Sequence, residues 1–205
     1  MDALIIVDVQ NDFVPGGNLA VPRGDEIIPL INALQSSFGL VLATQDWHPS
    51  VHKSFASNHP GKKPFEKIML GGLEQVLWPD HCIQGAAGSA FHDSLEMNRV
   101  ECIFRKGMDP EIDSYSGFYD NGYKKSTGLA GYLRERKAHR VFICGLAADY
   151  CVFHTAKDAL KEGFESYIID DAARAIDPAG YEKAKVDFKK LGGKIITSKT
   201  MPGGF

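Results

Sequence analysis

The sequence predicts an α/β protein with three layers, in which helices cover both faces of one six-stranded parallel sheet. Short apolar runs, typical of strands buried on both faces, alternate along the chain with segments of helical periodicity. Such alternation is typical of parallel strands joined by helical crossovers. With 205 residues the chain has the size of one domain, and we expect a single domain over residues 1–205.

Six segments are the predicted strands. They are dominated by apolar side chains, many of them β-branched, which suit a buried pleated surface. In chain order they cover residues 3–9, 39–44, 100–105, 141–146, 165–169 and 194–198.

Capping residues predict four helices between these strands. Side chains of Ser, Thr and Asp accept hydrogen bonds from the first helical turn, and glycine favours the position after the last turn. The expected starts are Asp25 (helix to about residue 38), Ser126 or Thr127, a position near Cys151 (helix to Gly163), and Asp177 before Pro178 (helix to residue 191).

The region of about 45–98 is the least regular part of the chain and is rich in His, Pro, Gly and Lys. A connection of this length inside a compact domain is usually functional or disordered. Its aromatic residues and histidines argue against disorder. We therefore expect this loop region to contribute to a metal and substrate site.

Composition and charge exclude several classes of function. The net charge is −3, with 44% hydrophobic residues, so no basic surface is expected to attract nucleic acid or an anionic membrane. No apolar run approaches the roughly 20 residues of a membrane span. The first residues lack the basic segment of a secretory leader, so we expect a cytoplasmic protein.

The four cysteines are widely spaced and contain no CxxC pair, which suits a reducing compartment. Cys102 and Cys144 lie inside predicted strands, so we expect both in the core. Cys82 follows a histidine and is expected to pack near a site.

Reactive side chains lie at or just beyond the carboxyl ends of four predicted strands. They are Asp8, Asp46 with His48, Lys106, and Cys151. Ligands of open α/β sheets bind at this edge. One shared site explains these four positions better than four separate coincidences.

Cys151 follows a turn of small residues and opens a predicted helix. Free N–H groups at a helix start favour an anion, so we expect a depressed thiol pKa and donors for an oxyanion. The Lys106 ammonium would stabilise a thiolate, and the Asp8 carboxylate could accept the thiol proton. The alternative is a buried structural cysteine beside an ordinary ion pair.

Asp46 and His48, with His52, His59 or His81, offer oxygen and nitrogen ligands for a divalent metal ion such as zinc, iron or manganese. The set contains no thiolate, which suits a site that keeps water ligands. No glycine-rich phosphate motif follows a strand, so nucleotide binding has no support.

Six short motifs share one property, which is their order along the chain: Asp8-Val9-Gln10-Asn11-Asp12-Phe13, Asp46-Trp47-His48-Pro49, Trp78-Pro79-Asp80-His81-Cys82, Lys106-Gly107, Tyr115-Ser116-Gly117-Phe118 and Gly145-Leu146-Ala147-Ala148-Asp149-Tyr150-Cys151. In this order they resemble the motifs of nicotinamidases, a branch of the isochorismatase-like cysteine hydrolases. The resemblance covers nearly the whole chain. The second and third motifs are the more specific to the nicotinamidase branch.

The resemblance implies an isochorismatase-like hydrolase fold and a catalytic triad. In it Asp8 would be the acid and base, Lys106 the electrostatic partner and Cys151 the nucleophile. The backbone N–H groups of Ala147 and Cys151 would form the oxyanion hole, after a cis peptide bond between Leu146 and Ala147.

The resemblance also implies one divalent metal ion, zinc with iron or manganese as alternatives, bound by Asp46, His48 and His81 and facing the pyridine nitrogen of the substrate. His52 is a candidate for an additional ligand. The residues expected to contact the substrate are Phe13, Trp78, Tyr115, Leu146 and Tyr150.

The implied activity is hydrolysis of nicotinamide to nicotinate and ammonia through a thioester, in NAD salvage, with pyrazinamide as a further substrate. The alternative is a related amidase for another small carboxamide, ureido or carbamoyl compound, which would not need the metal. A non-catalytic binding module should lack a member of the triad, and none is absent. The expected partner is this small molecule, with no nucleic acid and no membrane, and a homo-oligomer is left open.

Overall fold

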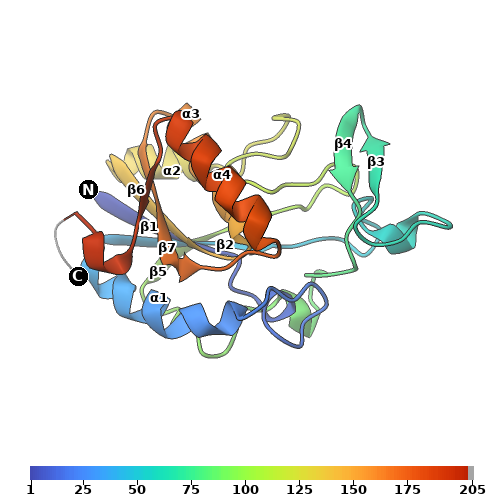
Figure 1. The fold of residues 1–205 in the computed structure, drawn as a ribbon, viewed down its shortest axis with the longest axis horizontal. Helices are drawn as coiled ribbons and strands as arrows, with labels where there is room; N and C mark the ends of the chain where they lie inside the picture. The colour runs from blue at the N-terminus through green and yellow to red at the C-terminus, as the bar shows by residue number, and fades with distance from the viewer. Residues whose placement is uncertain (203–205) are drawn as a thin grey trace.

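The computed structural model describes residues 1–202 and contains a parallel β-sheet between two layers of helices (Figure 1). The strand order is β5-β2-β1-β6-β7-β8, and all neighbouring strands run parallel. The predicted fold class is therefore confirmed. The strands are β1 (Asp2–Val7), β2 (Leu40–Asp46), β5 (Val100–Lys106), β6 (Arg140–Gly145), β7 (Glu165–Ala173) and β8 (Lys194–Ile196).

Helices cover both faces of this sheet. Helix α1 (Ile28–Leu34) packs on one face, and α2 (Leu129–Glu135), α3 (Phe153–Lys161) and α4 (Pro178–Lys190) pack on the other. Side chains of β1 alternate between the two cores, with Leu4 and Ile6 on the α1 side and Ile5 and Val7 opposite. Because both faces are buried, the strand sequences are continuous apolar runs.

The first predicted helix is shorter than expected. A 3₁₀ turn (Gly24–Ile27) precedes α1, and a second 3₁₀ turn (Gln35–Ser37) follows it. Asp25 lies inside the first turn and does not cap α1. The reason is Pro29 in the first turn of α1, which has no N–H to donate and so favours the start of an α-helix over its interior.

The structure confirms the predicted cap of α4 and supports part of the prediction for α2. Asp177 accepts a hydrogen bond from the N–H of Ala179 at 3.0 Å, at the start of α4. Ser126 and Thr127 accept bonds from the N–H groups of Gly128 and Leu129, but Gly128 is the residue that immediately precedes α2. Both side chains therefore stabilise the turn that leads into α2.

A β-hairpin lies inside the region expected to be irregular. Strands β3 (Lys67–Leu70) and β4 (Leu73–Val76) pair antiparallel and project away from the central sheet (Figure 1). The turn consists of Gly71 and Gly72, with φ of 57° and 86°, values that glycine adopts without strain. This Gly-Gly pair between two short apolar segments could have predicted the hairpin.

Of the two cysteines predicted to lie in the core, the structure confirms one and corrects the other. Cys144 is fully buried in β6, whereas Cys102 is only half-buried because β5 is the edge strand of the sheet. Within residues 1–202, no helix has the length and apolar character needed to cross a membrane.

Candidate active site and metal centre

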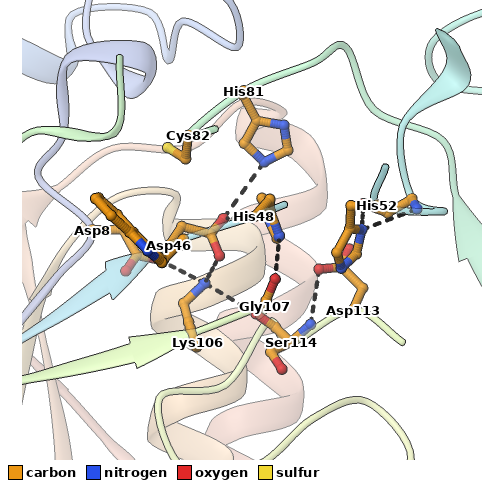
Figure 2. A network of polar contacts seen from close by, with 12 residues as sticks. Asp8, Asp46, His48, His52, His81, Cys82, Lys106, Gly107, Asp113 and Ser114 are labelled. Carbon is orange, nitrogen blue, oxygen red and sulfur yellow. Dashed lines mark hydrogen bonds and ion pairs between the residues drawn. The ribbon is translucent and has the colours of Figure 1, made fainter. Parts of the chain in front are cut away.

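Asp8, Asp46, His48 and Lys106 converge at the carboxyl edge of the sheet (Figure 2), and the Cys151 thiol lies beside Lys106. Asp8 follows β1, Asp46 ends β2, Lys106 ends β5 and Cys151 comes after β6. Chain order along the sheet reverses at β1, which lies between β2 and β6. Open α/β sheets place ligand sites at such a reversal.

Lys106 links the three other groups. Its Nζ lies 2.9 Å from Asp8 Oδ2, 3.0 Å from Asp46 Oδ1 and 3.5 Å from Cys151 Sγ, and it donates to the Ser114 carbonyl at 3.0 Å. Burial alone would lower the pKa of this ammonium, but the Asp46 and Asp8 carboxylates outweigh burial and raise it well above its usual value. Lys106 is therefore a permanent cation.

Asp8 has a backbone φ of 48°, in the left-handed region that few residues other than glycine occupy. Its Oδ1 accepts a hydrogen bond of 2.6 Å from Thr44 Oγ1, while Oδ2 faces Lys106. Burial raises the pKa of Asp8 despite Lys106, which acts in the opposite direction. A buried carboxylate with one oxygen free of other partners can accept and return a proton.

Cys151 lies in a π-helical turn (Ala148–Val152) immediately before α3. Here the predicted depressed pKa is wrong. Burial raises the pKa of the thiol well above its usual value, and Lys106 opposes burial without overcoming it. The resting group is therefore a neutral thiol.

The peptide bond between Leu146 and Ala147 is cis, as expected. The Ala147 N–H donates to no acceptor within residues 1–202, so it remains free for a ligand oxygen. The Leu146 side chain is fully buried in the core on the α1 side and does not line the cavity, contrary to its predicted substrate contact. Ala147 lines the cavity instead, because the Leu146 side chain packs in the core.

Asp149 has a position that the sequence did not explain. Its carboxylate accepts hydrogen bonds from the N–H groups of Ile176 and Asp177, at 3.0 and 2.8 Å. These bonds fasten the turn that contains Cys151 to the loop between β7 and α4. Ile176 lines the cavity, so Asp149 helps to shape it.

The two predicted histidine ligands have defined tautomers. His48 Nδ1 lies 2.8 Å from the Gly107 carbonyl and His81 Nδ1 lies 2.8 Å from the Pro79 carbonyl. A carbonyl can only accept, so both Nδ1 atoms carry hydrogen and both Nε2 atoms of the neutral rings have free lone pairs.

These lone pairs face Asp46. His48 Nε2 is 3.0 Å and His81 Nε2 is 3.5 Å from Asp46 Oδ2, and no residue from 1 to 202 donates a hydrogen bond to His48 Nε2 (Figure 2). One ligand atom from each of the three side chains lies within 4.8 Å of the others. Asp46 raises the pKa of His48, so a proton on this ring can offset the carboxylate. With both rings neutral, three buried acceptors face one another, and this donor set fits a divalent metal ion.

His52 has two contacts at Nδ1. The backbone N–H of Ser54 donates to this atom at 3.1 Å, and the Ser54 hydroxyl lies 2.7 Å from it. Burial lowers the pKa of His52 to about 4, which keeps the ring neutral at pH 7. Its buried Nε2 has no hydrogen-bond partner within residues 1–202, and His52 stays a candidate for an additional ligand.

Two neighbours fix the metal-facing residues in place. The Gln10 side chain pairs with both backbone groups of Asp46, donating to its carbonyl and accepting from its N–H, each at 2.8 Å. Gly107, with φ of 68°, leaves space for the His48 ring, because a Cβ there would lie 2.3 Å from His48 Cε1.

A narrow cavity of about 20 Å³ lies beside these groups, and most of the predicted substrate residues line it. The rings of Trp78 and Tyr150 have centroids 4.9 Å apart, and Tyr115 lies 5.4 Å from Tyr150. The lining comprises Phe13, Leu19, Asp46, Trp78, His81, Asp113, Tyr115, Ala147, Tyr150, Cys151 and Ile176.

Asp113 and Gln75 were missed by the sequence analysis. Asp113 is buried, lines the cavity and lies within a second cluster of possible ligands, with His48 and His52. Gln75, from the unpredicted hairpin, donates to Asp113 Oδ2 at 3.0 Å and to the Tyr115 hydroxyl at 3.2 Å. The only sequence signal for Asp113 is its place just before the aromatic loop motif that begins at Tyr115. Gln75 has no such signal.

A six-stranded parallel sheet with these side chains at its carboxyl edge is the architecture of isochorismatase-like hydrolases. The chain belongs to the isochorismatase family, because residues 2–200 match the isochorismatase domain.

Relatives with high similarity include a nicotinamidase of Acinetobacter baylyi, which is 54% identical over 178 residues that cover 87% of this chain and 83% of the relative. The solved structure of a nicotinamidase/pyrazinamidase from Acinetobacter baumannii superimposes with a TM-score of 0.93, at 49% identity and with 96% and 95% of the two chains covered. A pyrazinamidase of Pyrococcus horikoshii in complex with zinc gives a TM-score of 0.77 at 40% identity, with 96% and 98% covered.

Proposed function

We propose that this protein is a metal-dependent cysteine amidohydrolase that converts nicotinamide to nicotinate and ammonia. The observation that carries the proposal is one narrow aromatic cavity with Cys151 and the acceptor set of Asp46 and His81 on its wall, in a chain 54% identical to a nicotinamidase. A pyridine carboxamide matches this cavity: it has a carbonyl carbon for the thiol, a basic ring nitrogen and a flat ring for the aromatic walls.

The first half of the reaction forms a thioester. As Cys151 Sγ attacks the amide carbon, Asp8 takes the thiol proton and Lys106 stabilises the negative charge on sulfur. The charge then moves to the former carbonyl oxygen, where the N–H groups of Ala147 and Cys151 can donate to it. Asp8 gives its proton to the leaving nitrogen, and the C–N bond breaks to release ammonia.

The second half hydrolyses the thioester. Asp8, ionised again, accepts a proton from a water molecule that attacks the thioester carbon. The C–S bond breaks, and the proton on Asp8 returns to the sulfur. The product leaves as nicotinic acid, which gives its remaining acid proton to water and becomes nicotinate. Lys106 remains protonated throughout, which agrees with its raised pKa.

Asp46, His48 and His81 would bind the divalent metal ion, which as a Lewis acid would hold the ring nitrogen and so orient the carboxamide. The nitrogen-rich ligand set and the zinc-bound pyrazinamidase relative favour zinc, with iron and manganese as alternatives. The tautomers of His48 and His81 support this role.

Pyrazinamide keeps the ring and the carboxamide, so we expect it to be a second substrate. Ureido and carbamoyl compounds have no aromatic ring nitrogen, and the three facing acceptors would have no function toward them. We propose a role in NAD salvage within the cytoplasm, because the product nicotinate is a precursor of the pyridine nucleotides.

The test is ammonia release from nicotinamide by the zinc-loaded protein, beside Cys151→Ala and a chelated sample. We expect turnover by the loaded protein only, with a loss in Cys151→Ala of at least 10³-fold, since nucleophile removal typically costs this much or more. Readdition of zinc to the chelated sample should restore the rate.

Absence of turnover by folded, zinc-loaded protein would contradict the proposal. Turnover that survives chelation would contradict the role of Asp46, His48 and His81. Turnover by Cys151→Ala would contradict the role of the thiol.

A further inference from the structure

A second cavity lies next to the substrate cavity and is much larger. Its volume is about 220 Å³, against about 20 Å³ for the substrate cavity. Aromatic side chains form much of its wall: Tyr115, Tyr119, Tyr123 and His154. His154 lies three residues beyond Cys151, so this cavity begins one helical turn away from the nucleophile.

Tyr115 lines both cavities. Its ring centroid is 6.2 Å from that of Trp78 and 5.4 Å from that of Tyr150, two residues of the substrate cavity. It is 5.3 Å from the ring of His154, which lines the second cavity. One aromatic ring therefore forms the partition between the two spaces.

The Tyr115 partition is held in place at both ends. Its hydroxyl accepts a hydrogen bond of 3.2 Å from Gln75 Nε2, and its backbone N–H donates to Asn121 Oδ1 at 3.0 Å. Gln75 is itself bonded to the buried Asp113 carboxylate. Because Gln75 comes from β4 and Asn121 from the loop that contains Tyr115, the ring cannot leave its position without breaking contacts within its own loop and with a separate segment.

The carboxylates around the second cavity have partners. Asp158 accepts a hydrogen bond of 2.6 Å from the Tyr123 hydroxyl, Asp120 accepts from backbone N–H groups such as that of Gly122, and Glu74 accepts from Lys67. Burial lowers the pKa of His154 to about 4, so this ring is neutral at pH 7. Besides the Lys157 ammonium, the cavity offers a ligand aromatic surface and one neutral imidazole, which suit a flat aromatic group.

We propose that Tyr115 determines substrate size by closing the substrate cavity against this second cavity, so that the enzyme is restricted to carboxamides of a single ring. Without the Tyr115 ring, the second cavity accepts an aryl substituent on the pyridine ring. This inference rests on the proposed nicotinamidase function.

The test compares nicotinamide with 5-phenylnicotinamide and 6-phenylnicotinamide by ammonia release from the zinc-loaded enzyme. The variants are Tyr115→Ala, which removes the partition, and Tyr115→Phe, which keeps the ring and loses only the hydroxyl. Tyr115→Leu is a second opening variant that retains apolar packing. Bound zinc and a cooperative thermal transition show that each variant is folded.

We expect wild type and Tyr115→Phe to prefer nicotinamide over both phenyl compounds by at least 100-fold in kcat/KM. In Tyr115→Ala and Tyr115→Leu this preference should fall at least tenfold for one phenyl isomer or both, through a lower KM. An unchanged preference in the folded opening variants overturns the proposal, and so does efficient cleavage of the phenyl compounds by wild type.

Binding measured by calorimetry keeps this result separate from the proposed reaction. In a Cys151→Ala background, Tyr115→Ala should bind a phenyl compound at least tenfold more tightly than the single variant does. Equal binding overturns the role of Tyr115. Absence of ammonia release from nicotinamide by wild type overturns the proposed function instead, and the binding comparison still decides whether Tyr115 separates the cavities.

Discussion

At the scale of single residues, burial decides the protonation of Asp8 and Cys151, whereas neighbouring carboxylates decide that of Lys106. Asp8 and Cys151 both have raised pKa values because both are removed from water, even though a lysine ammonium lies beside them. Desolvation penalises the charged form of each acid. The proposed reaction therefore begins from a thiol and a carboxylate, between which one proton moves.

Thr44→Val tests how Asp8 is tuned. The Thr44 hydroxyl stabilises the ionised carboxylate, so its loss should raise the pKa of Asp8 further. Asp8 must be ionised to accept the thiol proton, so activity is lost as pH falls through this pKa. We expect the acid limb of the kcat/KM profile to move to higher pH in Thr44→Val.

The control is Thr127→Val, which removes a half-buried hydroxyl that donates to the Gly117 carbonyl at 2.6 Å and has no hydrogen bond to Asp8. Its acid limb should coincide with that of wild type. If Thr44→Val also keeps the wild-type limb, Asp8 is not the group that titrates there.

At the scale of elements, each strand end supplies one group, and the segments after the strands set the relative positions of these groups. The chain after β1 provides Gln10. Its side-chain amide forms two hydrogen bonds with the Asp46 backbone at the end of β2, as the backbone of a neighbouring strand would do. The π-helical turn after β6 presents Cys151, and Asp149 fastens this turn to the loop after β7. Hydrogen bonds between strand ends therefore define the site more than the strands alone do.

Gln10→Ala tests this element-level positioning. The substitution leaves the N–H and C=O of Asp46 without their partners, so the metal-facing carboxylate should become less ordered. Removal of an outer-shell partner typically weakens metal binding 10–100-fold, and we expect a loss of about this size in zinc affinity. Calorimetric titration of the chelated protein with zinc gives the affinity directly.

Gln84→Ala is the matched control, because the Gln84 amide donates to the neighbouring Trp47 carbonyl at 3.1 Å on an exposed surface. It should leave the zinc affinity within about twofold of wild type, the scatter expected of an exposed surface substitution. Equal affinities in Gln10→Ala and Gln84→Ala would show that Gln10 does not position Asp46.

At the scale of the whole molecule, the Lys106 cluster joins three strands of the sheet through buried charges. Removing one partner of a buried ion pair is costly because an uncompensated charge stays behind. Lys106→Met leaves Asp8 and Asp46 buried without their ammonium. We expect the free energy of unfolding in urea to fall by about 3–5 kcal/mol, together with loss of turnover.

Lys53→Met is the comparison, since Lys53 Nζ pairs with Glu111 Oε2 at 2.7 Å while the two side chains are 46% and 63% exposed. Exposed pairs contribute about 0–1 kcal/mol, so this variant should be nearly as stable as wild type. Equal unfolding free energies for the two lysine variants would mean that the buried cluster contributes no more than a surface pair.

Much of this architecture could be predicted because it depends on local sequence patterns. The six strands, the cap at Asp177 and the positions of Asp8, Asp46, Lys106 and Cys151 at strand ends follow from periodicity and turn residues. Strand ends meet at one edge in any parallel sheet, so their convergence was also predictable.

What only the tertiary structure decided depends on contacts between distant segments. The neutral states of Cys151 and His52 both result from burial. The partition by Tyr115 depends on Gln75 from a hairpin that the sequence analysis missed. Sequence alone therefore determined which groups meet at the edge of the sheet, because periodicity and turns are local. Their protonation, hydrogen-bonding roles and cavity walls depend on desolvation and packing, which exist only once the chain has folded.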